Sequence, residues 1–209
     1  MFKAHLFNPA RICAELYNPT RRGGLSLSGF LQPAAREQLL CEIQKHVRWF
    51  RPASRDYLNA VQEFDFFHLG EQDDDRITGN FETILRLRAR YARLYKMMAE
   101  QARFHSPGAL NSITVQRYPQ DSLGITSHRD ESQSINLISI FVLAGEAPFG
   151  ISTDRQKSDV VELPASPGDL ILLRAPRDRH EPTERKMRPL HYVGRVVRER
   201  YSLTFREKM

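Results

Sequence analysis

Residues 200–206 read Arg-Tyr-Ser-Leu-Thr-Phe-Arg, and this alternation of polar and apolar side chains predicts a β-strand with two unlike faces. The apolar face, which we expect to lie against a hydrophobic core, carries Tyr201, Leu203 and Phe205. The polar face carries Arg200, Ser202, Thr204 and Arg206. In a barrel interior two guanidinium groups are costly unless anions meet them, whereas on an exposed edge strand they would protect against aggregation. At about 3.3 Å per residue the two arginines lie roughly 20 Å apart, which leaves room for a short dianion between their side chains.

Short β-branched and aromatic runs separated by turn signals fill the chain from Ser112 onward. They predict six strands, at Ser112–Tyr118, Ser134–Leu143, Phe149–Ser152, Asp159–Leu163, Leu170–Arg174 and Val193–Arg206. Upstream, apolar residues at helical spacing predict one helix between Ala34 and Phe50 and another between Phe81 and Arg103. Helices followed by many strands predict an α+β fold whose strands form a sandwich or barrel.

The composition is typical of one globular domain, with 209 residues, 41% hydrophobic and 27% charged. No apolar run approaches the roughly 20 residues that span a bilayer, and the first residues lack the pattern of a signal peptide. Two cysteines, Cys13 and Cys41, are too few for a disulfide framework or a thiolate zinc site. We therefore expect a cytoplasmic protein with no membrane contact and no obligate protein partner.

The formal net charge is +6, from 31 Lys and Arg residues against 25 Asp and Glu residues. Such a charge attracts phosphate groups, although solubility alone explains many basic proteins. One face of the second predicted helix carries Arg86, Arg88, Arg90, Arg93 and Lys96. A solvated face on a core-packed helix is the commoner explanation of such a row, and a nucleic-acid-binding face is the alternative.

The triplet His128-Arg129-Asp130 is a candidate for part of a metal site. In an extended segment, residues two apart point to the same side, so both side chains can reach one cation. An imidazole and a carboxylate are two thirds of the facial triad that holds Fe(II) and leaves positions open. The third ligand must come from His180 or His191. We favour His180, which follows a predicted strand at a loop, over His191, which leaves little chain for a return strand.

In order and spacing these motifs resemble the AlkB-like Fe(II)/2-oxoglutarate dioxygenases, whose pattern is Asn-x-Tyr, His-x-Asp, a distal His and Arg-x-Asn-x-Thr-x-Arg. Gln116-Arg117-Tyr118 stands ten residues before His128, and Gly168-Asp169 resembles the segment that leads to the distal histidine. The resemblance covers roughly residues 111–206. It implies a single domain over 1–209, with a helical buttress and possible substrate lid at 1–110 and a catalytic double-stranded β-helix (a jelly-roll barrel) at 111–209.

The resemblance also implies roles for individual residues. His128, Asp130 and His180 would ligate Fe(II), and Arg200 and Arg206 would bind the two ends of 2-oxoglutarate. Hydrogen bonds to this cosubstrate would come from Tyr118, Ser202 and Gln116. With O2 as the other cosubstrate, the protein would hydroxylate or oxidatively demethylate its substrate and release succinate and CO2.

Three residues depart from the family pattern. Gln116 and Ser202 each replace an Asn but still form hydrogen bonds, so cosubstrate binding is expected to survive. Ser132 stands where base-repairing members usually carry an acid that reads the damaged base, and the adjacent Glu131 points the other way on a strand. This departure leaves the iron chemistry intact and weakens the repair assignment.

The sequence leaves three substrate classes open. A nucleic-acid base is slightly favoured because of the positive charge and because several aromatic residues could stack on a flipped base. These residues, which fit equally well in a core, are Trp49, Tyr57, Phe64, Phe66 and Phe67. A small-molecule or amino-acid-type metabolite is the alternative, and a barrel that binds a ligand or partner without catalysis is a minor one.

Overall fold

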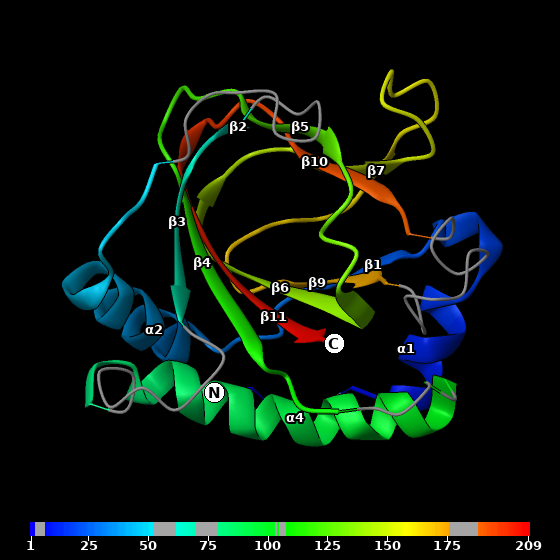
Figure 1. Ribbon diagram of the computed structural model, residues 1–209, viewed down its shortest axis with the longest axis horizontal. Helices are drawn as coiled ribbons and strands as arrows, with labels where there is room; N and C mark the ends of the chain where they lie inside the picture. Colours follow the sequence, from blue (N-terminus) through cyan, green and yellow to red (C-terminus); the bar gives the residue numbers. More distant parts are fainter. Residues whose placement is uncertain (3–6, 52–61, 70–78, 103, 105–107, 176–187) are drawn as a thin grey trace.

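Two antiparallel β-sheets face each other and are covered on one side by helices (Figure 1). The structure is a computed structural model that describes residues 1–2, 7–51, 62–69, 79–102, 104, 108–175 and 188–209. The larger sheet has the strand order β1 (Gly24–Leu27), β9 (Leu170–Arg174), β6 (Ser134–Glu146), β11 (Arg198–Lys208), β4 (Ser112–Tyr118) and β3 (Asp65–Leu69). The smaller sheet has the order β2 (Gln62–Glu63), β5 (Gly124–His128), β10 (Leu190–Val193), β7 (Phe149–Ser152) and β8 (Val161–Glu162). The expected α+β fold with a double-stranded β-helix is confirmed.

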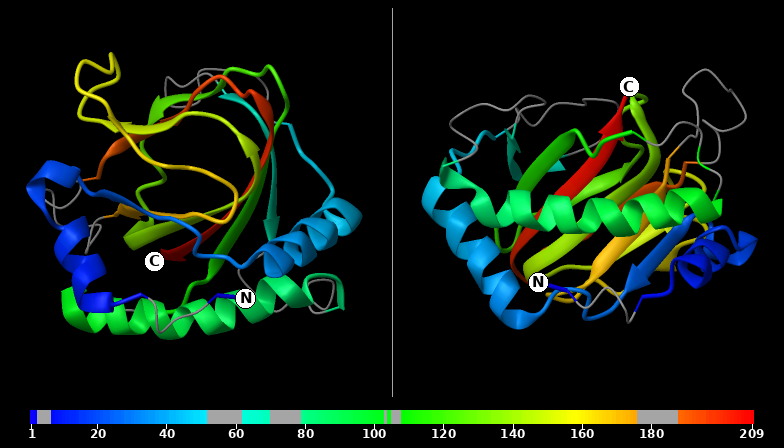
Figure 2. Two further views of the ribbon diagram at one scale, coloured as in Figure 1. Left: turned by 180° about the vertical axis from the view of Figure 1, so that it is seen from behind. Right: turned by 90° about the horizontal axis from the view of Figure 1, so that it is seen from below.

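Among the described residues, three α-helices lie against the larger sheet: α1 (Pro9–Leu16), α2 (Pro33–His46) and α4 (Glu82–Ala102). A short 3₁₀ helix, η2, spans Pro19–Arg21. Figure 2 shows α4 lying across the outer face of the larger sheet, and α1 and α2 contact both this helix and strands of the sheet. None of the described helices is long and apolar enough to cross a membrane.

The packing of α4 explains why this helix is amphipathic. Its buried stripe includes Leu87, Tyr91 and Leu94, which belong to the same hydrophobic cluster as Phe141 and Phe205. The Tyr91 ring meets Phe141 edge-on at 5.1 Å, and the Tyr91 hydroxyl lies 2.7 Å from the hydroxyl of Ser139. The first turn of α4 is capped from another helix, because the Glu42 carboxylate accepts hydrogen bonds from the backbone N–H groups of residues 83 and 84 at 2.8 and 3.1 Å. The helical layer is therefore fixed to the sheet by burial and by specific polar contacts.

Strand β11 has the two faces that its alternation predicts. The outer residues Tyr201, Leu203 and Phe205 are buried in the cluster shared with α4. The inner residues Arg200, Ser202 and Thr204 are also buried, but between the two sheets. Because β11 lies in the middle of the larger sheet, between β6 and β4, its arginines are not edge-strand charges.

The remaining predictions of secondary structure are largely confirmed. Four predicted strands appear as β4, β6, β7 and β9, and the two helices as α2 and α4. The prediction of one strand over Val193–Arg206 is wrong, because residues 194–197 are not part of a strand and the chain passes there from β10 in the smaller sheet to β11 in the larger one. The strand predicted at Asp159–Leu163 is reduced to β8. The part of the chain before residue 110 also contributes α1, β1, β2 and β3, none of which was predicted.

An irregularity in β11 lies beside Arg200. The pairing with β6 shifts register on both sides of Tyr201, which pairs with Ala144 while Ser202 pairs with Val142. The adjacent Gly145 has a φ of +85°, and a Cβ atom there would lie 2.2 Å from the carbonyl oxygen of Glu199 and 2.5 Å from the Arg200 Cα. Only glycine fits this close approach of the two strands.

Candidate metal and cosubstrate site

His128, Asp130 and His191 form a cluster in which three potential metal ligands lie within 4.8 Å of one another. His128 ends β5, and His191 is its partner across the ladder on β10. The Nε2 atoms of His128 and His191 lie 3.8 and 3.5 Å from Oδ1 of Asp130. Two imidazoles and one carboxylate that converge in this way are the donor set of a facial triad for Fe(II).

Second contacts hold two of these side chains in place. Nδ1 of His128 lies 2.9 Å from the carbonyl oxygen of Thr126, which leaves Nε2 directed at the cluster. The Oδ2 atom of Asp130 accepts a hydrogen bond from Nε of Arg206 at 2.7 Å, which leaves Oδ1 for a cation. Such outer contacts orient ligands before metal binds.

The electrostatic environment keeps the cluster in the form that binds metal. Burial, and then the neighbouring His191, lower the pKa of His128 to about 4, so its imidazole is neutral at neutral pH. Burial alone would raise the pKa of Asp130, but Arg206 and the two histidines hold it well below its usual range. A neutral imidazole beside an ionised carboxylate needs to release no proton when it binds a divalent cation.

Arg200 is the most unusual residue of the cavity. Its side chain is 1% exposed, and Nε and Nη2 have no hydrogen-bond partner anywhere in the described part of the chain. Its guanidinium carbon lies 5.7 Å from the ring centres of both Tyr118 and Phe149. Burial lowers the pKa of this guanidinium, and nothing described neutralises its charge. A cation in this position requires an anionic ligand.

The two constellations share one small cavity. It is lined by the three residues of the cluster and by all five predicted cosubstrate residues, Gln116, Tyr118, Arg200, Ser202 and Arg206. The Ser202 hydroxyl donates to Oε1 of Gln116 at 3.4 Å across neighbouring strands. The residues predicted for the metal and those predicted for the cosubstrate therefore line the same cavity.

Arg206 has a contact that the sequence did not reveal. Besides binding Asp130, it donates from Nη1 to the hydroxyl of Thr114 at 3.0 Å, and this hydroxyl lies 3.1 Å from Nδ1 of His68. The sequence contained no signal for the pairing of Arg206 with Asp130, because the two residues are far apart in the chain and meet only through strand packing.

His180 lies outside the described residues, which resume at position 188. Among the described residues, the third member of the cluster is His191, the alternative that we ranked second. Our argument against His191 assumed too little chain for a return strand. The segment 194–197 suffices, because β10 and β11 belong to different sheets and no hairpin between them is needed.

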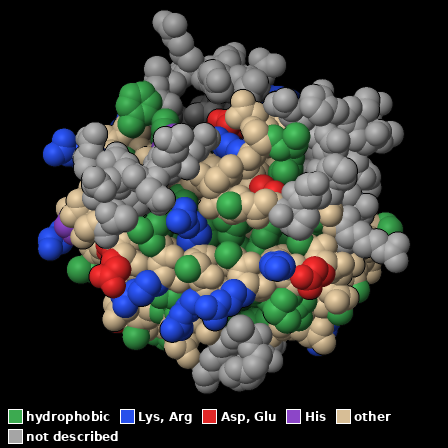
Figure 3. Space-filling view, turned by 60° about the horizontal axis from the view of Figure 1, so that its bottom comes forward, with side chains coloured by type: hydrophobic (Ala, Val, Ile, Leu, Met, Phe, Trp, Pro, Cys, Tyr) green, Lys and Arg blue, Asp and Glu red, His purple; other side chains and the backbone are tan. Residues whose placement is uncertain are grey.

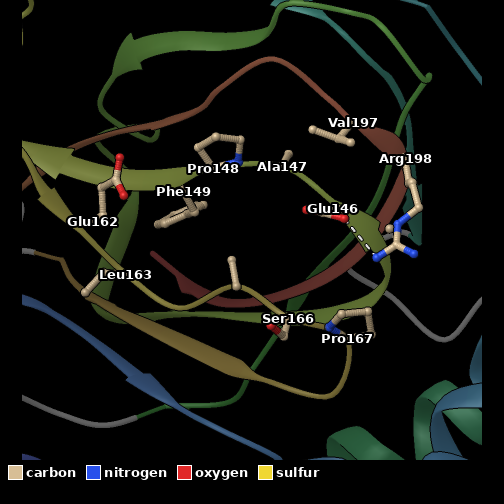
Figure 4. Close-up of a pocket in the computed structure, with 12 residues that line it drawn as sticks. Glu146, Ala147, Pro148, Phe149, Glu162, Leu163, Ser166, Pro167, Val197 and Arg198 are labelled. Atoms are coloured by element: carbon tan, nitrogen blue, oxygen red, sulfur yellow. Dashed lines mark ion pairs between the residues drawn. The ribbon is translucent and has the colours of Figure 1, made fainter.

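Phe149 separates this cavity from a second, larger one. The second cavity has a volume of about 500 Å³ and lies at the opposite end of the barrel, where β6 ends and β11 begins (Figure 4). Its rim carries the ion pair between Glu146 and Arg198, at 2.8 Å. The Phe149 ring stacks on His191 at 6.0 Å and closes the floor beside Arg200. The sequence analysis treated Phe149 only as the start of a strand.

The aromatic candidates for base stacking fall into two groups. Trp49 packs on the outer face, against Tyr201 and the guanidinium of Arg117, and Phe67 meets Phe81 there. Phe64 and Phe66 belong to the cluster between the sheets. Tyr57 lies outside the described residues.

Glu131 precedes Ser132, which stands at the position of the base-reading acid. Its carboxylate forms an ion pair with Lys208 at 2.8 Å. It does not line the cavity, and neither does Ser132. The weakness of the repair assignment therefore persists in the structure.

No family model matches this chain, and no curated protein sequence matches it. Solved structures do. A prolyl hydroxylase from Trichoplax adhaerens, in complex with a peptide fragment of the hypoxia inducible factor oxygen degradation domain, has a TM-score of 0.69 at 15% identity, over 98% of this chain and 92% of its own. A Pseudomonas putida prolyl-4-hydroxylase has a TM-score of 0.68 at 12% identity, over 97% of this chain and 100% of its own. A 2OG-Fe(II) oxygenase family oxidoreductase from Burkholderia pseudomallei has a TM-score of 0.61 at 16% identity, over 98% of this chain and 92% of its own.

The fold of this chain is similar to that of these three structures, and its His-x-Asp…His cluster has the donor set of a facial triad. Two of these three structures are prolyl hydroxylases, and the similarity extends over nearly the whole chain. At these identities the similarity concerns the fold, and nothing in it singles out the AlkB-like group.

Proposed function

We propose that this protein is an Fe(II)/2-oxoglutarate-dependent dioxygenase that hydroxylates or oxidatively demethylates its substrate. The observation that carries the proposal is the buried, unpaired guanidinium of Arg200 in the same cavity as the His128, Asp130 and His191 cluster. A buried cation without an anion is unstable, whereas a dicarboxylate cosubstrate that binds metal at one end would supply that anion at the other.

The cluster and the cavity support the following assignment of residues. His128, Asp130 and His191 would hold Fe(II), and Arg200 would bind the distal carboxylate of 2-oxoglutarate, with Tyr118, Gln116 and Ser202 beside it. When bound, Fe(II) with 2-oxoglutarate and O2 supplies the oxidising chemistry, in which one oxygen atom enters succinate, CO2 is released and the other oxygen atom enters the substrate.

The other residues of the cavity position these groups. Arg206 fixes the orientation of Asp130 through Oδ2 and keeps this carboxylate ionised. Phe149 lies against His191 and Arg200 and lines both cavities, so its apolar ring would exclude water from this side of the site. Exclusion of water strengthens the attraction between Arg200 and a carboxylate, because the local dielectric constant is lower.

For the substrate we propose an aliphatic C–H bond of an amino-acid-type compound, free or within a peptide. Two observations support this choice over a nucleic-acid base. Ser132 and Glu131, at and beside the position of the base-reading acid, do not line the cavity, and two of the structural neighbours are prolyl hydroxylases. An AlkB-like base substrate is the second candidate, favoured by the spacing of Arg200, Ser202, Thr204 and Arg206 and by the net charge of +6.

The test is aerobic incubation with Fe(II) and 2-oxoglutarate, with succinate as the readout, against a panel of amino acids, prolyl peptides and methylated nucleosides. We expect succinate formation by the native protein and none by the Asp130→Ala variant. Failure of the native protein to bind 2-oxoglutarate in the presence of metal would contradict the proposal and favour a non-catalytic barrel. Turnover stimulated only by methylated nucleosides would replace the amino-acid-type substrate by the base.

A further inference from the structure

A row of positive side chains lies along the solvent-facing side of α4. We define this basic strip as Arg86, Arg90, Arg93 and Lys96, all of which are exposed. The arginines are four and three residues apart, so they share one face of the helix, and Lys96 lies beside them one turn further on. At 1.5 Å per residue the strip is about 15 Å long. Figure 3 shows Lys and Arg side chains gathered on this face of the molecule, between isolated acidic groups.

The charges of the strip are largely uncompensated. Arg86 is 3.8 Å from Glu82, whereas Arg90, Arg93 and Lys96 form no ion pair with any residue of the described chain. Elsewhere on the described surface, ion pairs are formed by Arg21 with Glu15, Arg22 with Asp159, Arg51 with Asp65, Arg198 with Glu146 and Lys208 with Glu131. Lys157 and Arg195 also form no ion pair within the described chain, so what distinguishes the strip is that its four cations share one helix face, whereas on an ordinary solvated face opposite charges alternate.

The surroundings of the strip decide which anion fits it. The apolar side of α4 is buried against the larger sheet, so this helix has no apolar face to insert into a lipid bilayer. The core of a protein interface is typically rich in aromatic residues and Met, and the only large apolar side chain of α4 among those most exposed is Met97, at 51%. Contacts to a nucleic-acid backbone, in contrast, need little more than cations in a line.

We propose that the basic strip is a docking surface for the phosphate backbone of a nucleic acid, bound without regard to sequence. The strip lies on the helix that covers the outer face of the larger sheet, whereas the metal and cosubstrate cavity lies between the two sheets. A nucleic acid on the strip therefore does not occupy the cavity. The proposal is independent of the oxygenase activity and of the choice of substrate.

The test measures binding of the full chain to a fluorescently labelled DNA duplex of about 20 base pairs over a series of salt concentrations. The charge-reversal variant Arg90→Glu/Arg93→Glu/Lys96→Glu is compared with the matched control Arg155→Glu/Lys157→Glu/Arg195→Glu. The control changes the same residue types by the same charge at exposed positions on the side of the smaller sheet. All six side chains are exposed, and thermal unfolding verifies that both variants fold.

The native protein is expected to show a slope of log affinity against log salt near −3, since each phosphate neutralised contributes about −0.9. Reversal of the strip is expected to lower affinity by about tenfold or more and to flatten the slope, while the control retains most of both. Equal losses in the two variants, or binding that does not depend on salt, would overturn the proposal. So would a strip-dependent affinity for vesicles of phosphatidylcholine and phosphatidylserine that matches or exceeds the affinity for DNA.

Discussion

Alternate residues of the stretch 200–206 form the two faces of β11, and these two faces have opposite roles. On the outer face Tyr201, Leu203 and Phe205 are buried in a continuous apolar cluster with α4. On the inner face a buried arginine has unpaired nitrogen atoms, and the hydroxyl of Thr204 is also buried without a partner in the described chain. Burial of apolar area stabilises the fold, whereas burial of unpaired polar groups destabilises it. The outer face therefore stabilises the fold, whereas the inner face lowers stability and provides groups that can bind a ligand.

The largest effect is expected from the removal of a metal ligand on the inner side. His191→Ala should reduce succinate formation by about 10³-fold or more, equivalent to about 4 kcal/mol, because it removes one of three ligands. His180→Ala is the matched variant, and we expect it to retain most of the activity. Metal binding followed by calorimetry separates loss of the ion from loss of chemistry. Loss of metal in His180→Ala, with retention in His191→Ala, would reverse the assignment.

For a substitution on the outer face we expect a loss of stability without a loss of cosubstrate binding. Leu203→Ala removes a fully buried side chain and should lower the free energy of unfolding by about 3 kcal/mol. Urea denaturation measures this change. The affinity of the folded variant for 2-oxoglutarate should remain within about twofold of the native value, since small shifts below 1 kcal/mol are expected away from a site. A large rise in the dissociation constant would show that the two faces are not independent.

For the inner face we expect a loss of cosubstrate binding without a loss of stability. Arg200→Met removes the partner of the cosubstrate carboxylate and should weaken 2-oxoglutarate binding by about 30-fold or more, or 2 kcal/mol. The same change replaces a buried, unpaired cation by an apolar side chain of similar length, so the free energy of unfolding should stay constant or rise. The comparison would fail if Arg200→Met unfolded at lower urea concentration with unchanged cosubstrate affinity.

The smallest effect is expected at Arg206, which acts through Asp130. Arg206→Gln should lower metal affinity by about tenfold, because the carboxylate loses the contact that orients it. Arg206→Lys, which keeps the charge but not the fork of donors, should recover only part of this loss. Titration with Mn(II) in the absence of 2-oxoglutarate measures the effect separately from cosubstrate binding. Native metal affinity in Arg206→Gln would show that the contact with Asp130 has no positioning role.

The fold was largely predictable because its strands have regular periodicity. Alternation in β11 and the apolar runs of β6 and β9 identify strands, and period 3.6 identifies α4. Strands β1 and β2 were missed because they are short and contain no β-branched residue, whereas β3 contains Phe66 and Phe67, which were considered only as candidates for base stacking. Gly194 was an available signal for the break between β10 and β11, and we passed over it.

The candidate site was predictable where its residues lie close together in the chain. His128 with Asp130, and Arg200 with Ser202, share a face of one extended segment, so sequence spacing reveals them. The third histidine and the contact between Arg206 and Asp130 depend on which strands become neighbours. That information comes from long-range packing, which local periodicity does not contain.

Two adjacent residues of β11 make contacts on opposite sides of the larger sheet: Glu207 contacts the helical layer, and Arg206 contacts Asp130 in the cavity between the sheets. The buried carboxylate of Glu207 accepts hydrogen bonds from Tyr95 of α4 at 2.6 Å and from Asn136 of β6 at 2.8 Å. Consecutive residues of a strand point to opposite faces, so these contacts and the Arg206–Asp130 pair fix the same short piece of backbone. A change in the seating of α4 would therefore reach Asp130, a member of the candidate metal cluster, through one peptide unit. Coupling between the helical layer and the candidate metal cluster would then need no mobile element, only the stiffness of a single amide plane.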